Sequence, residues 1–202
     1  KGWNFDSWMG DGGKSKSIMA YNEHDTEYEG THQPGGTAIR VTGAMSQYVK
    51  KRSPDSRKLG RYCSVVMYSN PGKKCRFVSV YNICKGNPKG LRTQNQQIKR
   101  YMQRKNINDK TPRELLDADF VKQCALWTKS GEELCVMGDI NDDVVSGSFT
   151  TMLKKEGIEM EEFGEEYCGG EAVDSYVFGS GRIAGGGWKT KNLEIKQLVM
   201  FY

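Results

Sequence analysis

The residues best suited to chemistry stand at the end of an apolar run, in the stretch VMGDINDD from Val136 to Asp143. Side chains alternate along an extended chain, so a strand that ends here brings Asp139 and Asn141 to the same side. A carboxylate can bind a metal ion or orient a water molecule, and an amide can donate to a phosphate oxygen. This pairing suits phosphodiester hydrolysis, in which negative charge develops on oxygen. A polar turn also favours Asp and Asn, so both interpretations stay open.

An apolar strand over Glu133–Asp139 has to position this corner. Gly138 permits a close approach or an unusual backbone angle there. Two other runs, Arg61–Ser69 and Cys75–Ile83, are strand-like, and the Pro-Gly turn between them predicts an antiparallel hairpin. An alternating run after a Gly-Gly turn predicts another strand over Thr37–Val41.

Three segments predict helices that cover these strands. Leu91–Lys105 has good helix formers with apolar residues at helical spacing. The clearest helix follows Thr111, which can cap it together with Glu114 in a capping box, and it ends near Gly131. Ser146–Phe163 predicts a third helix. Strands are also predicted within Ser175–Trp188 and Asn192–Tyr202, so the expected fold class is an α/β sandwich.

Short motifs occur in a fixed order between about Gln33 and Ile195, and they are QPGGTAI, LGRYCSV, VSVYNICK, NQQ, TPRELL and VMGDIND. Together they resemble the endonuclease/exonuclease/phosphatase superfamily, which has the DNase I-like fold. They look most like the endonuclease domains of non-LTR retroelements. The resemblance implies a β-sandwich flanked by helices, here incomplete at both ends. We expect a polar segment over residues 1–34 and the partial domain over residues 35–202.

The resemblance implies a Mg²⁺-dependent phosphodiesterase that acts on DNA or RNA. Asp139 matches the aspartate that positions the water or the metal, and it is the weak candidate for a metal ligand. Asn141 matches the asparagine that holds the scissile phosphate. Tyr81 matches the strand-end tyrosine that contacts this phosphate, although a cross-strand aromatic is an equal alternative. Asn82 is expected to line the same cleft. Further substrate contacts are expected from the basic residues Arg61, Lys85 and Arg92.

Several positions depart from the family pattern. Ala184 stands where the family has an aspartate, and Phe178 stands where an arginine is usual. Neither His24 nor His32 matches the histidine base, and Glu23 is interpreted as a loop acid rather than the metal glutamate. General acid–base catalysis needs a group of suitable pKa within reach of the water. We therefore expect the chain to be inactive or crippled as a nuclease.

Two alternatives to a nuclease remain. The fold could serve as a non-catalytic structural or interaction subunit, or as a nucleic-acid-binding module that uses the basic stretches Lys50–Arg61 and Lys85–Lys105. The resemblance also implies that the first strands of the sandwich are missing, which would expose a sheet edge. Such an edge invites pairing, so other protein chains are expected to cover it.

Composition limits the kinds of protein that this chain can be. The chain has 202 residues, of which 37% are hydrophobic and 27% charged, and its net charge of +5 is compatible with a nucleic-acid partner. Its apolar runs are shorter than the roughly 18 residues that predict a membrane span. The six cysteines lack CxxC spacing, so a zinc site is not expected. Several lie in apolar runs, which predicts free thiols and an intracellular, reducing compartment.

Overall fold

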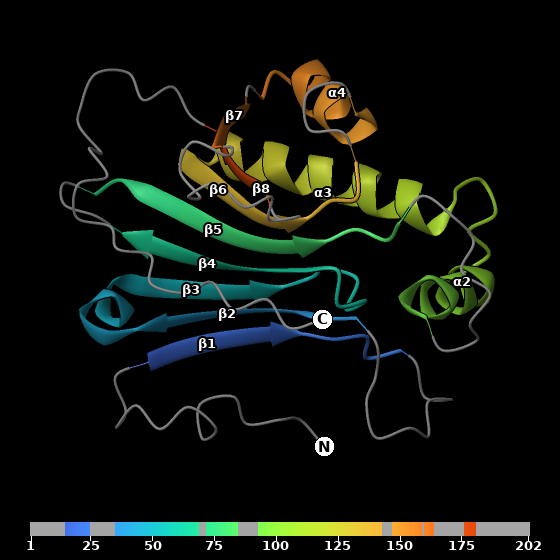
Figure 1. Ribbon diagram of the computed structural model, residues 1–202, viewed down its shortest axis with the longest axis horizontal. Helices are drawn as coiled ribbons and strands as arrows, with labels where there is room; N and C mark the ends of the chain where they lie inside the picture. The colour runs from blue at the N-terminus through green and yellow to red at the C-terminus, as the bar shows by residue number, and fades with distance from the viewer. Residues whose placement is uncertain are drawn as a thin grey trace, which may run out of the picture.

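The computed structural model describes residues 15–24, 35–68, 72–84, 93–142, 147–158, 160–163 and 176–180, with side chains in all but the last two ranges. These residues form a two-stranded sheet, a six-stranded sheet and helices, so the predicted α/β fold class is confirmed (Figure 1). The strands are β1 (Ser15–Ala20), β2 (Thr37–Thr42), β3 (Val49–Pro54), β4 (Tyr62–Tyr68), β5 (Lys74–Tyr81), β6 (Glu132–Asp139), β7 (Met160–Phe163) and β8 (Tyr176–Ser180). The helices are η1 (Gly43–Tyr48), α2 (Gln94–Arg104), α3 (Pro112–Lys129) and α4 (Ser148–Lys155).

The six-stranded sheet has the order β3-β4-β5-β6-β8-β7, and the small sheet pairs β1 with β2. β4 and β5 form the predicted antiparallel hairpin. β5 and β6 are parallel, because α2 and α3 lie between them in the chain and return it to the same end of the sheet. The carboxyl ends of β5 and β6 therefore lie side by side at the same end of the sheet.

Layers on both faces of the large sheet bury its side chains. α3 and α4 cover one face, where Phe120 and Leu153 pack with Val78 and Val136 of the strands. β1 and β2 cover the other face, where Ile39 packs with Val65 of β4. Alternate side chains of a strand point to opposite faces, so β4 contributes to both layers. Figure 1 shows these layers, with α3 and α4 on one side of the large sheet and β1–β2 on the other. β1 lies within residues 1–34 and pairs with β2 along its whole length.

The predicted start of α3 is confirmed. The Thr111 hydroxyl accepts from the Glu114 amide, and the Glu114 carboxylate accepts from the Thr111 amide, which is a complete capping box. The third predicted helix is wrong in its second half, because α4 ends at Lys155 and Gly157 adopts a φ of 73°. Such a left-handed residue stops a helix. The chain then continues as β7, which pairs with β8.

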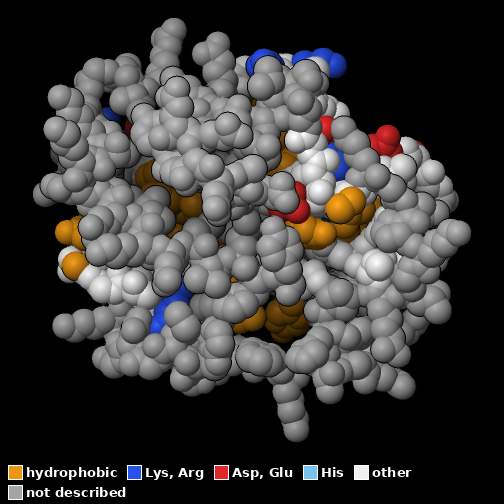
Figure 2. All heavy atoms as spheres, viewed as in Figure 1, with side chains coloured by type: hydrophobic (Ala, Val, Ile, Leu, Met, Phe, Trp, Pro, Cys, Tyr) orange, Lys and Arg blue, Asp and Glu red, His pale blue; other side chains and the backbone are white. Residues whose placement is uncertain are grey.

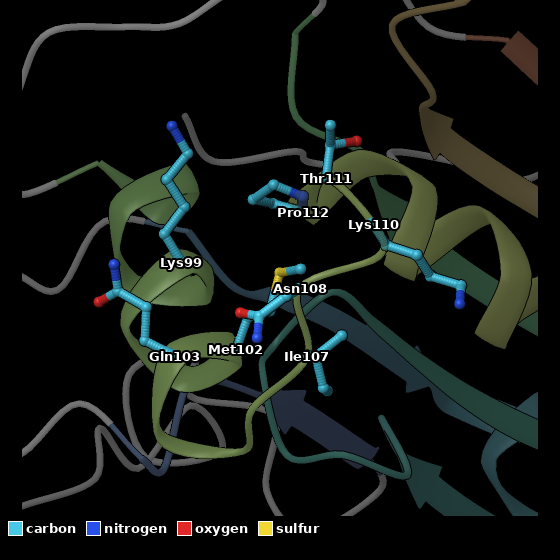
Figure 3. Close-up of a pocket in the computed structure, with 8 residues that line it drawn as sticks. All are labelled: Lys99, Met102, Gln103, Ile107, Asn108, Lys110, Thr111 and Pro112. Atoms are coloured by element: carbon cyan, nitrogen blue, oxygen red, sulfur yellow. The ribbon is translucent and has the colours of Figure 1, made fainter.

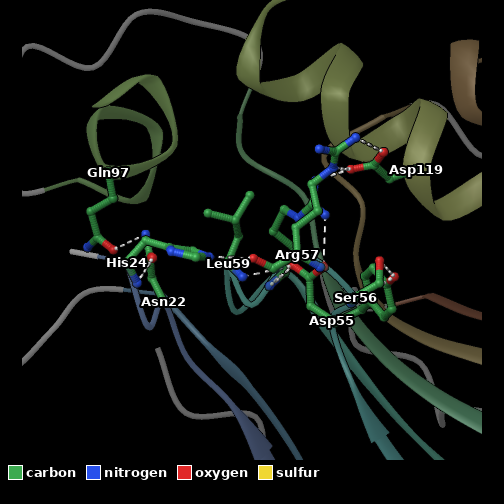
Figure 4. A network of polar contacts seen from close by, with 10 residues as sticks. Asn22, His24, Asp55, Ser56, Arg57, Leu59, Gln97 and Asp119 are labelled. Atoms are coloured by element: carbon green, nitrogen blue, oxygen red, sulfur yellow. Dashed lines mark hydrogen bonds and ion pairs between the residues drawn. The ribbon is translucent and has the colours of Figure 1, made fainter. Parts of the chain in front are cut away.

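Buried ion pairs tie the loop between β3 and β4 to α3. The Arg61 guanidinium is fully buried and donates to both carboxylate oxygens of Asp55, at 2.7 and 2.8 Å. Its third nitrogen donates to Asp119 on α3 at 3.0 Å. Arg57 also reaches Asp119 (Figure 4). This network fixes α3 over the sheet, because each buried charge has an opposite partner.

Figure 2 shows Lys and Arg side chains at the top of the molecule, over α4, whose last turn contains Lys154 and Lys155. No helix in the described ranges is both long enough and apolar enough to cross a membrane.

Candidate functional site

The ends of β5 and β6 form one polar corner. Tyr81 and Asp139 are register partners in the parallel pair and are the last residues of their strands. One residue further on, the backbone amide of Asn82 donates to the backbone carbonyl of Asp139 at 2.8 Å. The sheet thus holds the backbones of these predicted site residues side by side.

Gly138 makes this close approach sterically possible. Its φ is 145°, and a Cβ atom built there would lie 1.8 Å from the carbonyl oxygen of Val80. No side chain can occupy that space, because the obstacle is backbone of the neighbouring strand. The glycine of the Gly-Asp-Ile-Asn stretch is therefore required by the geometry of β5 and β6.

Asp139 and Asn141 lie together for a different reason from the one predicted. β6 ends at Asp139, and Asn141 has a φ of 49°, so the chain is not extended between them. The Asp139 carboxylate accepts a hydrogen bond of 3.0 Å from the backbone amide of Asn141, as in an Asx turn. Alternation along a strand is thus the wrong explanation. The turn interpretation is correct for the backbone, and the turn itself brings the two side chains together.

The Asn141 side chain joins the two strand ends. Its amide nitrogen donates to the Asn82 carbonyl at 2.7 Å, and its oxygen accepts from the Cys84 thiol at 3.2 Å. An amide nitrogen carries two hydrogens, and the second has no partner among the described residues, so it can donate to a ligand. Asp139 keeps one carboxylate oxygen without a partner among the described residues. The corner therefore offers one donor and one acceptor at fixed positions.

The predicted role of Asn82 does not fit its place. The residue is only 1% exposed, and its side-chain amide donates to the Asp117 carboxylate at 2.8 Å. Burial raises the pKa of Asp117 above its ordinary value, and nearby Arg113 and the bond from Asn82 oppose this increase. Asn82 supports the corner from inside, through its carbonyl to Asn141, instead of lining a cleft.

Of the predicted basic contacts, the structure describes Arg61. Arg61 is 0% exposed and bound to Asp55 and Asp119, so its guanidinium cannot reach a phosphate, and the expected contact is wrong. Lys85, Arg92 and Ala184 lie outside the described residues.

Sequence reasoning missed the residues that support the corner from α3. Arg113, in the first turn of α3, donates to the carbonyls of Ile83 and Ile140. Asp117 follows one turn later and accepts from Asn82. An Arg–Asp pair at i and i+4 is visible in the sequence, but it normally indicates a surface ion pair. Only the tertiary contact shows that this pair faces the strand ends.

Among the described residues, the corner offers few ligands for a Mg²⁺ ion. The described part of the chain holds no group of three or more His, Cys, Asp and Glu residues arranged to bind a metal. Two further carboxylates lie near the corner. Asp142 accepts from Ser148 and Phe149 at the start of α4, Asp117 accepts from Asn82, and Arg113 lies against both acids. Asp139 and Asn141 alone supply one carboxylate and one amide. Magnesium dependence therefore stays a prediction.

A pocket of about 280 Å³ lies beside the start of α3. Figure 3 shows Lys99 and Met102 on α2 facing Thr111 and Pro112 across it. Its wall does not include Tyr81, Asp139 or Asn141. The pocket is therefore separate from the polar corner.

Comparisons with known proteins give structural likeness at low sequence identity. No family model and no curated protein sequence matches the chain. The chain is similar to the human Nocturnin catalytic domain with bound sulfate, at 8% identity and a TM-score of 0.49, covering 83% of this chain and 60% of that one. It is also similar to Staphylococcus aureus beta toxin, at 14% identity and a TM-score of 0.41, covering 81% of this chain and 62% of that one. A β-hairpin deletion mutant of that toxin gives 13% identity and 0.41, covering 81% and 63%. The chain thus spans about three-fifths of the length of each of these structures.

Proposed function

We propose that the corner at the ends of β5 and β6 binds a phosphodiester group of a nucleic acid. One observation carries this proposal: Tyr81 and Asp139 end neighbouring strands in register, and Asn141 bridges them through Asn82. The motif order resembles non-LTR endonuclease domains, and this resemblance supports nucleic acid as the substrate class. The chain would be a phosphodiesterase-type domain that binds its substrate and cleaves it slowly or not at all.

Each of the three residues has a part in such a site. The second amide hydrogen of Asn141, which has no partner among the described residues, donates to a phosphate oxygen without adding charge. Tyr81 contacts the phosphate from the end of the neighbouring strand. The free carboxylate oxygen of Asp139 accepts from a water molecule beside the phosphate. These groups are already held by the Asx turn and the strand register, so little reorganisation is needed when a ligand binds.

Weak catalysis is expected because the described residues bring no second proton acceptor to the corner. His24, the histidine that the structure describes, bonds to the Arg57 carbonyl and packs on Tyr101, in contact with neither corner strand end. Asp117 and Asp142 are engaged with Asn82 and with the start of α4. Asp139 is thus the available carboxylate among the described residues. A single carboxylate orients water but leaves general acid–base work incomplete.

The binding proposal is tested with a fluorescein-labelled oligonucleotide duplex and fluorescence anisotropy. Asn141→Ala removes the donor to phosphate, so we expect affinity to fall about tenfold, the effect of losing a hydrogen bond to a charged group. The matched control is Asn108→Ala, an exposed asparagine on the loop between α2 and α3. Equal affinities for Asn141→Ala, the control and the unmodified chain would refute the proposal.

Cleavage is tested separately with supercoiled plasmid and Mg²⁺. We expect little nicking above background, and any nicking should disappear in Asp139→Ala. Rapid, Mg²⁺-dependent cleavage that persists in Asp139→Ala would contradict the assignment of the corner.

A further inference from the structure

Arg113 makes contacts that join both halves of the polar corner. Its Nη1 donates to the Ile83 carbonyl at 2.8 Å, and its Nη2 donates to the Ile140 carbonyl at 3.2 Å. Ile83 follows Asn82 in the loop after β5, and Ile140 lies between Asp139 and Asn141 after β6. One guanidinium therefore links the backbone that leaves both strands.

The surroundings of Arg113 explain why its charge is stable there. Its side chain is 12% exposed, and its guanidinium lies 3.4 Å from the Asp142 carboxylate and 4.0 Å from that of Asp117. Those carboxylates have their own structural bonds, to the start of α4 and to Asn82. The cation thus offsets part of the negative charge of the two acids that flank the corner.

We propose that Arg113 is a positioning residue, which fixes the Asn141 side chain relative to the end of β5. The effect of this positioning on phosphate binding rests on the proposed function, whereas the positioning itself is a property of the protein without a ligand. Arg113 would not touch the phosphate. It would act through the Ile83 and Ile140 carbonyls, which set the path of both loops and therefore the distance between Asn141 and the Asn82 carbonyl.

Lysine cannot replace arginine in this role. The planar guanidinium presents separate N–H groups to two carbonyls at once, whereas an ammonium is a point charge on a flexible stem. Arg113→Lys keeps the charge and loses the double contact. Arg113→Met loses both. The two variants together separate the geometric role from the electrostatic one.

Arg57, in the loop between β3 and β4, supplies a matched control that contacts the same helix. Its guanidinium binds Asp119 of α3, so Arg57→Met also removes an ion pair between α3 and a preceding loop. Its contacts do not include the corner loops. A merely structural role for Arg113 predicts that both substitutions act alike.

The test follows the side-chain amide of Asn141 by NMR in ¹⁵N-labelled protein, with its signal assigned by its loss in Asn141→Asp. In the unmodified chain this amide is expected to exchange slowly, because it donates to Asn82. We expect Arg113→Met and Arg113→Lys to shift the signal and to speed its exchange at least tenfold, and Arg57→Met to leave both unchanged. A folded Arg113→Lys variant with an unchanged Asn141 signal overturns the proposal, as does an equal change in Arg57→Met.

Binding of the labelled duplex gives the functional readout. Both Arg113 variants should weaken it by an amount similar to Asn141→Ala. If the duplex does not bind the unmodified chain while the Asn141 signal still depends on Arg113, the proposed function fails and the positioning role stands. If binding is present and Arg113→Lys neither weakens it nor moves the signal, the positioning role fails alone.

Discussion

At the scale of single residues, Gly138 sets how closely β5 and β6 approach before the corner. We predict that Gly138→Ala destabilises the protein by about 3 to 5 kcal/mol, because the new methyl group meets backbone and the φ is unfavourable for a side chain. Chemical denaturation of purified protein measures this change.

The control for Gly138 is Gly131→Ala. That position has a φ of 77° and open space around its Cβ direction, so only backbone strain of about 1 to 2 kcal/mol applies. Equal effects at the two glycines would contradict the role of the close strand approach.

Cys84 is the exposed thiol among the cysteines that the structure describes, and it lies against Asn141. Burial raises the pKa of Cys63, Cys75 and Cys124 to about 12 and that of Cys135 to about 11. A raised thiol pKa keeps these groups protonated at pH 8, and the thiolate is the reactive form. We predict that iodoacetamide modifies Cys84 first, as measured by peptide mass spectrometry in a Cys168→Ser background. Faster labelling of Cys124 would contradict the described packing.

At the scale of elements, local signals predicted structure well and contact-dependent roles poorly. The Thr111 capping box and the β4–β5 hairpin follow from neighbouring residues, and both are confirmed. The predicted continuation of α4 beyond Lys155 was wrong because Gly157 turns the chain. Glycine is a stop signal that the sequence already shows. The expected substrate contact of Arg61 is wrong and the role of Arg113 was missed, since burial against Asp55 or against the strand ends depends on residues distant in the sequence. No local pattern reports such contacts.

The exposed basic residues Arg104 and Lys105, at the end of α2, belong to the predicted phosphate-contacting stretch. We predict that Lys105→Gln lowers the slope of log affinity against log salt by about 0.9, the change expected for one lost phosphate contact. Duplex binding between low and moderate salt measures the slope. Lys129→Gln, an exposed lysine at the end of α3, is the control and should leave the slope unchanged. Identical slopes for Lys105→Gln and the unmodified chain would remove α2 from the interface.

At the scale of the whole molecule, the prediction that other chains cover a sheet edge remains. β3 is one edge of the large sheet, and it carries Lys51, Arg52 and Pro54 and a register shift after Val49. Charges, proline and bulges discourage pairing at an edge. We predict self-association through an edge other than β3, so light scattering should give a mass above 22.8 kDa and Lys51→Thr should not change it. A monodisperse monomer would contradict this prediction.

We propose that a phosphodiester sits beside the Asp139 carboxylate, and the sign of a charge effect tests this placement most directly. Without Mg²⁺, Asp139→Asn removes a negative charge next to the phosphate, so duplex affinity should rise several-fold. Glu133→Gln removes the same charge at the opposite end of β6 and should change affinity little. Anisotropy titrations of the two variants in chelator-treated buffer provide the comparison. A rise confined to Asp139→Asn supports the phosphate site, whereas equal changes in both variants, or a fall in Asp139→Asn, would contradict it.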